Sequence, residues 1–214
     1  MSPVLDGRER LLRELATEVG DPRVLDAIAS VPRQAFVPED LREFAWLNQP
    51  LPIGEGQSIS QPVVVAHMCE LLRLTPADRV LDVGTGSGYH AALLSRLVGH
   101  VHSIERRPSL ARQAAENLRA AGIENVTLIV GDGTHGYAEA APYDAINVAA
   151  ASQDGVPPAL EGQLARGGRM IIPTGGTDRQ RLVLVERLGD GEVLRTSLQD
   201  VRFVPLVGGT PGTS

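Results

Sequence analysis

The feature that most constrains the fold is a regular alternation of short apolar runs and amphipathic stretches from residue 63 onward. Residues 79–83, 101–104, 126–130, 143–148 and 169–173 are predicted strands, and residues 63–74, 89–98, 108–121 and 157–164 are predicted helices. Strands and helices that alternate in this way form βαβ units, in which helices join parallel strands. We therefore expect the α/β class, with a doubly wound and mostly parallel sheet.

The two ends of the chain depart from this alternation. Near the C-terminus, residues 181–188 and 193–204 are predicted strands around a Gly-Asp-Gly turn, which favours an antiparallel pair at the sheet edge. Near the N-terminus, two predicted helices precede residues 32–62, which are rich in Pro and Gly but contain enough apolar side chains to be ordered. We expect N-terminal helices and a covering loop over residues 1–61, a core over residues 62–207 and a disordered tail over residues 208–214, all within one structural domain.

Composition excludes several classes of function. The 20 basic residues are all Arg, so the chain lacks the Lys that P-loop and Schiff-base enzymes require. A net charge of -6 without a basic run argues against a nucleic-acid surface. The one cysteine, Cys69, cannot form an internal disulfide, and the five histidines lack the companions of a metal site. No apolar run is long enough to span a membrane, so we expect a cytoplasmic protein.

The strongest local motif is a glycine-rich loop between the first predicted core strand and its helix. It reads Asp82-Val-Gly84-Thr85-Gly86-Ser-Gly88. Such a loop lets a ligand approach the backbone at a helix N-terminus. A dinucleotide fingerprint would need glycine where Tyr89 stands, and Asp82 would repel a pyrophosphate. S-adenosylmethionine (AdoMet) has no phosphate, and its ammonium group is a cation that Asp82 could attract, directly or through water.

Acidic side chains follow the next two predicted strands. Glu105, with Arg106 beside it, is placed to accept hydrogen bonds from ribose hydroxyls. Asp132 is placed to accept a hydrogen bond from the adenine amino group, with Gly133 and Thr134 next to it. The carboxyl ends of parallel strands line one crevice, where ligands bind in open α/β sheets. We therefore predict an AdoMet site without a metal, whose product is S-adenosylhomocysteine (AdoHcy).

Beyond these motifs, the chain resembles the protein-L-isoaspartate (D-aspartate) O-methyltransferase family over nearly its whole length. The resemblance lies in residues 31–37 (VPRQAFV), 51–54 (LPIG), 56–62 (GQSISQP), 80–89 (VLDVGTGSGY), 131–133 (GDG), 141–146 (APYDAI), 167–169 (GGR) and 203–206 (FVPL). The glycine-rich loop is common to many methyltransferases, whereas residues 58–62 and 203–206 are particular to this family. The resemblance implies a Rossmann-like methyltransferase fold.

The resemblance also implies an activity, which is methylation of the side-chain carboxylate of isoaspartyl residues in damaged proteins, followed by repair through a succinimide. It implies that Ser60 is catalytic and that Ser58 and Ile59 contact the cofactor. It further implies that substrate is bound by Ile53, Gly54, Ser60, Val204, Pro205 and Leu206. A carboxylate is ionised at neutral pH and needs no base, so we expect the Ser60 hydroxyl to orient it by a hydrogen bond. As partners we expect isoaspartyl-containing proteins and peptides, without nucleic acid or membrane, and we expect a monomer.

Several alternatives stay open. Ser58 and Ser60 can instead be turn residues that cap the following helix. This chain has Leu47 where the family usually has Asp, and residues 152–155 (SQDG) where prolines usually follow the fourth core strand. These departures suit a related enzyme that methylates an aspartyl carboxylate of one dedicated peptide. A non-catalytic AdoMet-binding protein and a nicotinamide dehydrogenase are further possibilities, the last disfavoured by Asp82 and Tyr89.

Overall fold

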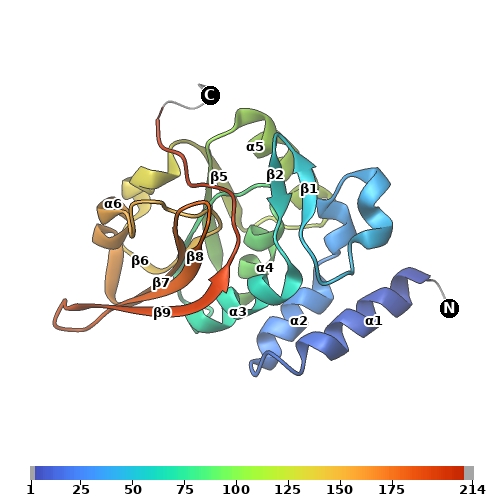
Figure 1. Ribbon diagram of the computed structural model, residues 1–214, viewed down its shortest axis with the longest axis horizontal. Coiled ribbons are helices and arrows are strands. Elements are labelled where there is room, and N and C mark those ends of the chain that lie inside the picture. The colour runs from blue at the N-terminus through green and yellow to red at the C-terminus, as the bar shows by residue number, and fades with distance from the viewer. Residues whose placement is uncertain (1–2, 210–214) are drawn as a thin grey trace.

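A seven-stranded sheet forms the centre of the computed structural model, which describes residues 3–209 (Figure 1). In order across the sheet, the strands are β5 (Val126–Val130), β4 (His100–Glu105), β3 (Arg79–Val83), β6 (Tyr143–Val148), β7 (Leu164–Gly175), β8 (Gln180–Arg187) and β9 (Val193–Val201). The first five are parallel to one another, and β8 pairs antiparallel with both of its neighbours. The predicted mostly parallel sheet with an antiparallel C-terminal edge is confirmed.

Helices cover both faces of this sheet. One face carries α3 (Pro62–Leu72), α4 (Tyr89–Leu97) and α5 (Pro108–Ala120), and the other carries the short helix α6 (Pro158–Gly162). The connection from β5 to β6 contains the 3-10 helices η3 (Gly133–His135) and η4 (Ala138–Ala140). Because α4 follows β3 while α6 follows β6, these neighbouring strands lead the chain to opposite faces. A crevice opens at the carboxyl ends of strands where the chain reverses in this way.

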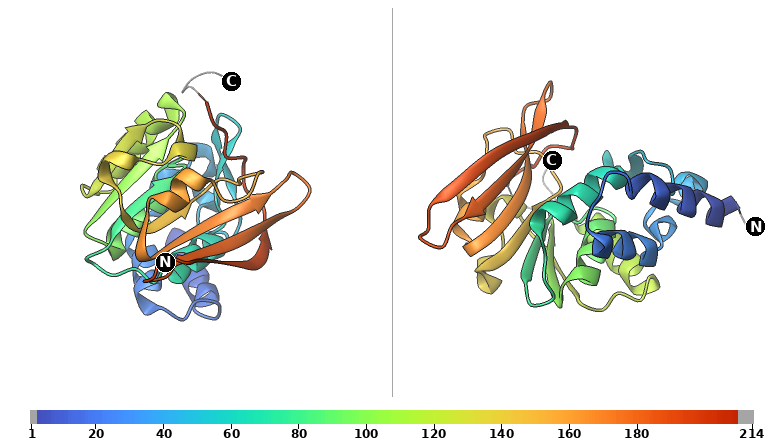
Figure 2. Two further views of the ribbon diagram at one scale, coloured as in Figure 1. Left: turned by 90° about the vertical axis from the view of Figure 1, so that its left-hand side faces the viewer. Right: turned by 90° about the horizontal axis from the view of Figure 1, so that it is seen from below.

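The N-terminal segment packs on the face that carries α3 and α4. Helices α1 (Pro3–Leu15) and α2 (Pro22–Ser30) lie at the end of the molecule opposite the β8–β9 hairpin (Figures 1 and 2). Their buried side chains, including Leu15 and Ile28, belong to the same core cluster as Leu93 of α4. The predicted N-terminal region and the predicted core region therefore share one hydrophobic core. None of the helices within residues 3–209 is long and apolar enough to cross a membrane.

Residues 32–62 are ordered, as expected, but they are more regular than the sequence indicates. They form the 3-10 helices η1 (Arg33–Phe36) and η2 (Glu39–Phe44) and an antiparallel hairpin of β1 (Leu51–Gly54) and β2 (Gln57–Ile59). The hairpin strands are only four and three residues long, too short for a periodic pattern to identify them. Gly54, Glu55 and Gly56 all have positive φ in its turn.

The C-terminal strand ends earlier than predicted. β9 stops at Val201, and the chain then leaves the sheet and runs back along its carboxyl edge. There the amide of Ala151 donates to the carbonyl of Val204 (2.8 Å), and the amide of Leu206 donates to the carbonyl of Ala151 (2.7 Å). This contact after β6 replaces pairing with β8, so residues 202–204 are not part of the sheet.

Other predicted bounds shift because of tertiary pairing. β7 begins at Leu164, five residues before the predicted start at residue 169, because it pairs with Tyr143 of β6, and α6 is correspondingly short. Of the tail predicted to be disordered, residues 208 and 209 are instead held in place, since the amide of Gly209 donates to Oδ2 of Asp132 (2.6 Å). Residues 210–214 of that tail lie outside the described residues.

Candidate active site

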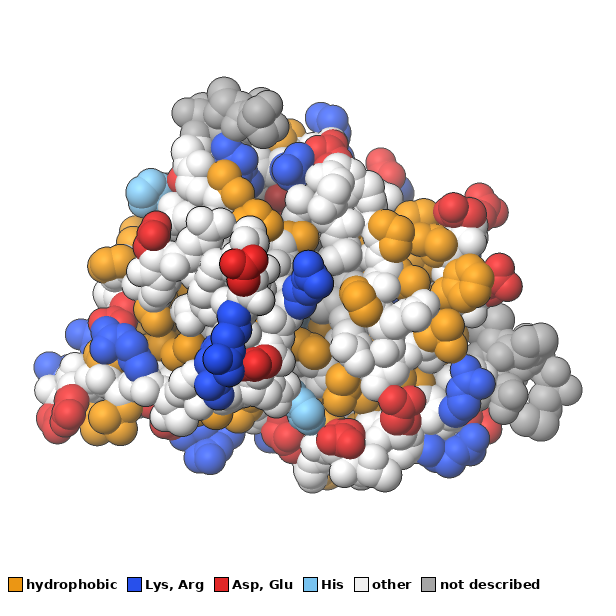
Figure 3. Space-filling view, viewed as in Figure 1, with side chains coloured by type: hydrophobic (Ala, Val, Ile, Leu, Met, Phe, Trp, Pro, Cys, Tyr) orange, Lys and Arg blue, Asp and Glu red, His pale blue; other side chains and the backbone are white. Residues whose placement is uncertain are grey.

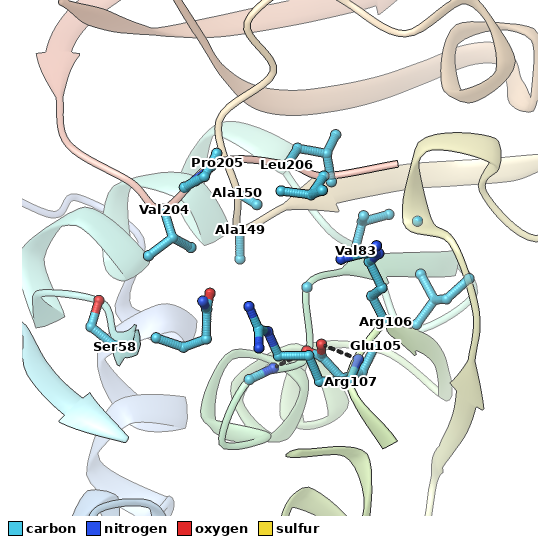
Figure 4. Close-up of a pocket in the computed structure, with 16 residues that line it drawn as sticks. Ser58, Val83, Glu105, Arg106, Arg107, Ala149, Ala150, Val204, Pro205 and Leu206 are labelled. Atoms are coloured by element: carbon cyan, nitrogen blue, oxygen red, sulfur yellow. Dashed lines mark hydrogen bonds between the residues drawn. The ribbon is translucent and has the colours of Figure 1, made fainter. Parts of the chain in front are cut away.

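Three cavities with shared walls lie where β3, β4 and β6 end. The strand-end cavity has a volume of about 740 Å³, counted to its open mouth, a size typical of small-molecule sites. It is lined by Gln57, Ser58, Val83, Gly84, Gly86, Ile104, Glu105, Arg106, Arg107, Gly133, Ala149, Ala150, Val204, Pro205, Leu206 and Val207. Figure 4 shows Glu105 and the two arginines after it facing the C-terminal segment across this cavity.

Glu105 presents its carboxylate to the strand-end cavity from the end of β4. Oε2 accepts a hydrogen bond from the amide of Gly86, and Oε1 accepts one from the amide of Arg107, both at 2.9 Å (Figure 4). The residue is only 7% exposed. Each oxygen keeps a further lone pair, so the carboxylate can still accept from two neighbouring hydroxyl groups. This is the placement that the predicted ribose contact requires.

Asp82 lines none of the three cavities, so of the two expected ways to attract the ligand, directly or through water, direct contact is not what its position favours. It is fully buried, and its carboxylate accepts from Oγ of Ser103 and Nδ2 of Asn147, both at 2.7 Å. These partners stand beside Asp82 on the neighbouring strands β4 and β6. Burial raises the pKa of Asp82 to about 6, against the lowering effect of the two hydrogen bonds. Asp82 is therefore a buried negative charge behind the glycine-rich loop.

Two further side chains extend this buried polar layer. Oγ1 of Thr85 lies 2.6 Å from Oγ of Ser103, and Nδ2 of Asn147 lies 3.2 Å from Nδ1 of His90. Burial lowers the pKa of His90 to about 3, so its ring is neutral near pH 7. With Nδ1 accepting from Asn147, the ring proton is on Nε2, 3.5 Å from the sulfur of Cys69. The other side chains of this layer are neutral, so its single negative charge is that of Asp82.

Two glycines of the predicted motifs are required by close packing. Gly88 caps α4 with a φ of +89°, and a Cβ on it would lie 3.3 Å from Cγ of Leu118. A Cβ on Gly133 would lie 2.5 Å from Cγ1 of Val83, a distance that no side chain tolerates. Gly133 therefore keeps a flat wall in the strand-end cavity, whereas Gly88 lines none of the three cavities and supports the loop from behind.

Asp132 and Thr134 flank Gly133 without lining the strand-end cavity. Oδ1 of Asp132 accepts from the amide (2.9 Å) and the hydroxyl (2.7 Å) of Thr134, and Oδ2 accepts from the amide of Gly209. Burial acts to raise the pKa of Asp132, but the hydrogen bonds from Thr134 and Gly209 outweigh it, and the pKa lies below its usual value. The predicted acceptor for an adenine amino group is thus already bonded to the C-terminal segment.

Ser60 lies at the junction of the other two cavities. The Ser60 cavity is lined by Pro50, Ser58, Ser60, Gln61, Val64, Ala149, Asp200, Val201, Arg202, Phe203 and Val204. The inner cavity is lined by Ser58, Ile59, Ser60, Val65, Gly84, Thr85, Gly86, Ser87, Tyr89, His90 and Ala149. Ser58 and Ala149 line all three cavities. The spaces next to Ser60 and next to Glu105 are therefore separated by single side chains.

The hydroxyl groups of Ser58 and Ser60 do not cap α3. This helix begins at Pro62 with Gln61 as its cap residue, and no side chain forms a capping hydrogen bond. Among the described residues, neither hydroxyl has a hydrogen-bond partner. The alternative in which these serines are helix-capping residues is therefore wrong, and both hydroxyl groups are available to a ligand.

The predicted substrate residues divide into two groups. Val204 lines both the strand-end cavity and the Ser60 cavity, and Pro205 and Leu206 line the former. Ile53 and Gly54 line none of the three. Ile53 is buried behind the glycine-rich loop, with its Cδ1 3.3 Å from where a Cβ on Gly86 would lie, and Gly54 ends β1 at the turn of the hairpin.

Most predicted cofactor residues are brought together, and several lining residues were missed. Those that line the strand-end or the inner cavity are Ser58, Ile59, Gly84, Thr85, Gly86, Glu105, Arg106 and Gly133. The missed residues include Ala149 and Ala150, which directly follow β6. The rule that ligands contact strand ends, which identified Glu105, would have identified these alanines too. No group of three His, Cys, Asp or Glu side chains suited to a metal ion occurs within the described part of the chain.

An ion pair fastens the β1–β2 hairpin beside the strand-end cavity. Glu55, in the turn, accepts from Nη1 of Arg107 (2.9 Å) and from the hydroxyl of Ser109 (2.6 Å) at the start of α5. The hydrogen bonds from Ser109 and Arg107 lower the pKa of Glu55, so it is ionised at neutral pH. The hairpin is thereby fixed to the helix that follows Glu105.

Comparisons with known proteins agree with one another. The family described as "Protein-L-isoaspartate(D-aspartate) O-methyltransferase" matches residues 7–211. A protein-L-isoaspartate O-methyltransferase of Roseiflexus sp. (strain RS-1) is 55% identical over 197 residues, covering 92% of this chain and 89% of that protein. A solved protein-L-isoaspartate O-methyltransferase has a TM-score of 0.83 at 32% identity, covering 96% of this chain and 67% of the other. A Plasmodium falciparum structure in complex with S-adenosyl-L-homocysteine has a TM-score of 0.79 at 26% identity, covering 94% and 98%.

Proposed function

Because the chain belongs to the protein-L-isoaspartate(D-aspartate) O-methyltransferase family, we propose that it transfers a methyl group from AdoMet to the side-chain carboxylate of L-isoaspartyl residues in damaged proteins and peptides. The ester then closes to a succinimide without the enzyme, and partial reopening to normal aspartate repairs the chain. One observation carries the proposal. Ser58 and Ala149 line all three cavities, so a cofactor beside Glu105 and a carboxylate beside Ser60 meet at one point.

The strand-end cavity and the inner cavity suit AdoMet. Glu105 accepts hydrogen bonds from the ribose hydroxyls, and the flat wall at Gly133 with the apolar side chain of Ile104 admits the adenine ring. Bound AdoMet supplies a methyl group on a positively charged sulfur. Asp82 attracts the cationic end of the ligand through the loop, because the backbone between Asp82 and Gly86 separates the carboxylate from the cavities.

Asp132 can bind the adenine amino group only in addition to its present partners. Each of its oxygens already accepts a hydrogen bond, so a ligand must use a remaining lone pair or displace the amide of Gly209. Arg106 lines the cavity beside Glu105. We assign Asp132, Thr134 and Arg106 to the cofactor side of the site on this basis.

The Ser60 cavity suits the substrate carboxylate. The Ser60 hydroxyl donates one hydrogen bond that orients a carboxylate oxygen toward the methyl carbon, and the surrounding Val64, Ala149 and Val204 exclude water from it. A carboxylate is already ionised at neutral pH, so no general base is required. The substrate backbone lies along residues 200–204, which form one wall of the cavity.

The partners follow from the open site and the surface charge. Damaged proteins and peptides with accessible isoaspartyl residues are the substrates, and the enzyme acts in the cytoplasm as a monomer without nucleic acid. The face in Figure 3 has arginines interspersed with acidic side chains, rather than one concentrated basic patch, and the net charge is -6. Light scattering of the purified protein measures the oligomeric state, and the mass of a dimer would contradict the proposed monomer.

The test is transfer of labelled methyl groups from AdoMet to two peptides that differ only in isoaspartate or normal aspartate. We expect label on the isoaspartyl peptide alone, released as methanol when the ester closes to the succinimide. Label on the aspartyl peptide would overturn the repair function. If neither peptide is labelled although AdoHcy binds, the alternative of one dedicated peptide substrate takes its place.

A further inference from the structure

Arg33 is a buried guanidinium group without an acidic partner. The residue is completely inaccessible to solvent, and burial lowers its pKa from the usual value, with no carboxylate among the charges that act on it. An unpaired buried charge is costly unless hydrogen bonds compensate for it. Its partners therefore indicate what the molecule gains from keeping it.

These partners are backbone carbonyl groups at three separate positions within residues 32–62. Nε of Arg33 donates to the carbonyl of Ala45 (2.9 Å), and Nη2 donates to the carbonyls of Ser60 (2.8 Å) and Gln49 (3.4 Å). The guanidinium carbon lies 4.8 Å from the ring centre of Tyr89, which stabilises the charge by a cation–π contact. Tyr89 and Ser60 both line the inner cavity.

The backbone at Ser60 needs a hydrogen bond from outside its own strand and helix to hold it in place. β2 ends at Ile59, and the first carbonyl that α3 uses is that of Gln61, so neither element fixes the carbonyl of Ser60. The planar guanidinium group can donate in several fixed directions at once. We infer that Arg33 is the positioning residue for Ser60, fixing residues 58–60 between the cofactor space and the Ser60 cavity. This inference rests on the proposed function for its kinetic part.

The chemistry indicates that geometry, rather than charge, is what Arg33 contributes. Methyl transfer forms a carbon–oxygen bond and breaks a carbon–sulfur bond, so the negative carboxylate and the positive sulfur are both neutralised. A nearby fixed cation would stabilise the ionised substrate more than the transition state, and therefore would not accelerate this step. A misplacement of about 1 Å in an aligned site can lower the rate by up to about 100-fold.

The kinetic test compares Arg33→Ala, Arg33→Lys and Arg169→Ala. Arg169 is a matched control, because it is half-buried on β7, donates to the carbonyl of Leu71 and pairs with Glu186, and lines none of the three cavities. We expect kcat on the isoaspartyl peptide to fall at least ~10-fold for Arg33→Ala. We expect the same for Arg33→Lys, which keeps the positive charge but lacks the planar guanidinium group with its fixed donor directions. We expect the Kd for AdoHcy to change less than ~3-fold in these variants. Added methylguanidine should restore part of the rate of Arg33→Ala, whereas methylamine should not. Normal kcat in Arg33→Ala or Arg33→Lys would overturn the inference.

A second measurement does not depend on turnover. Hydrogen exchange of residues 57–62 should become at least ~10-fold faster in Arg33→Ala, but not in Arg169→Ala, under conditions where both variants have the same free energy of unfolding. Unchanged exchange in this segment would overturn the positioning role. If the wild-type enzyme labels no isoaspartyl peptide, the proposed function fails, and this exchange measurement still decides the role of Arg33.

Discussion

The hydroxyl of Ser60 has no partner among the described residues and borders two cavities, so its removal should affect catalysis more than folding. We expect Ser60→Ala to retain AdoHcy affinity and to lose at least ~10-fold in turnover, since one positioned donor can contribute that much. The control is Ser30→Ala, whose hydroxyl donates to the carbonyl of Ala27 away from the site. Steady-state kinetics with the isoaspartyl peptide decide the matter, and near-normal turnover of Ser60→Ala would remove its assigned role.

The buried charge of Asp82 should be visible in the pH dependence of stability. Its pKa is about 6 in the folded protein, against 3.8 for the free group, so between pH 4 and 6 the folded state holds a proton that the unfolded state has released. The contribution of Asp82 to the free energy of unfolding therefore falls as the pH rises through this window, and its ionised form is destabilising at neutral pH. We expect Asp82→Asn to remove this slope in urea titrations between pH 4 and 6. An unchanged slope would show that Asp82 ionises normally.

The same substitution should weaken cofactor binding. Attraction over several ångströms at an effective dielectric constant of about 20 contributes roughly 1–2 kcal/mol, so Asp82→Asn should raise the Kd for AdoMet about 5- to 30-fold at pH 8. AdoHcy lacks the charge on sulfur and should lose less. Calorimetric titration with both ligands tests this, and an unchanged Kd for both ligands would argue against an electrostatic role.

At the level of single residues, the sequence located the acid at each strand end but not its partners. The places of Glu105 and Asp82 near strand ends could be predicted, because the position of a strand end depends only on the local hydrophobic pattern. That Asp82 is enclosed by Ser103 and Asn147 depends on which strands become neighbours, which no local pattern records. Ile53 lies outside the three cavities for the same reason, since its burial depends on a hairpin that the sequence did not indicate.

At the level of elements, prediction succeeded where an element forms its own pattern. The parallel strands β3, β4, β5 and β6 and the helices α4 and α5 carry their hydrophobic pattern within themselves, and their predicted bounds agree with the structure within one residue. The bounds of β7 and the ends of β9 and α6 were wrong, because pairing with residues distant in the chain sets them. The hairpin of β1 and β2 is stabilised largely by contacts outside it, such as those of Glu55.

The fastening of this hairpin leads to a prediction about ligand release. Glu55→Gln removes the charge that pairs with Arg107, and half-exposed ion pairs contribute about 0.2–1 kcal/mol. We expect AdoHcy to dissociate up to ~5-fold faster from this variant, with the difference shrinking at high salt. Glu39→Gln, which removes the exposed pair with Arg42, should release AdoHcy at the wild-type rate. Stopped-flow dissociation measures both, and equal rates for all three proteins would show that the hairpin does not control exit.

At the level of the whole molecule, the shared core predicts one cooperative unfolding transition. Side chains of α1, α2, α4 and β8 belong to one cluster, so the N-terminal segment should not melt separately. AdoHcy at about 100 times its Kd should add about 2.7 kcal/mol to the free energy of unfolding and raise the midpoint by several degrees. Differential scanning calorimetry with and without AdoHcy checks both points. A separate early transition would mean that residues 1–61 form an independent unit.

The walls of the active site come from distant parts of the chain, with residues 57–60 on one side and residues 200–207 on the other. On the ribosome, this arrangement means that a nascent chain stopped after β8 has its central strands and the glycine-rich loop but lacks half of the Ser60 cavity. On the proposed assignment of the site, methylation therefore begins only after residues 200–207 have been translated and have left the exit tunnel. Incomplete chains would compete for AdoMet at most, without modifying the proteins that surround them.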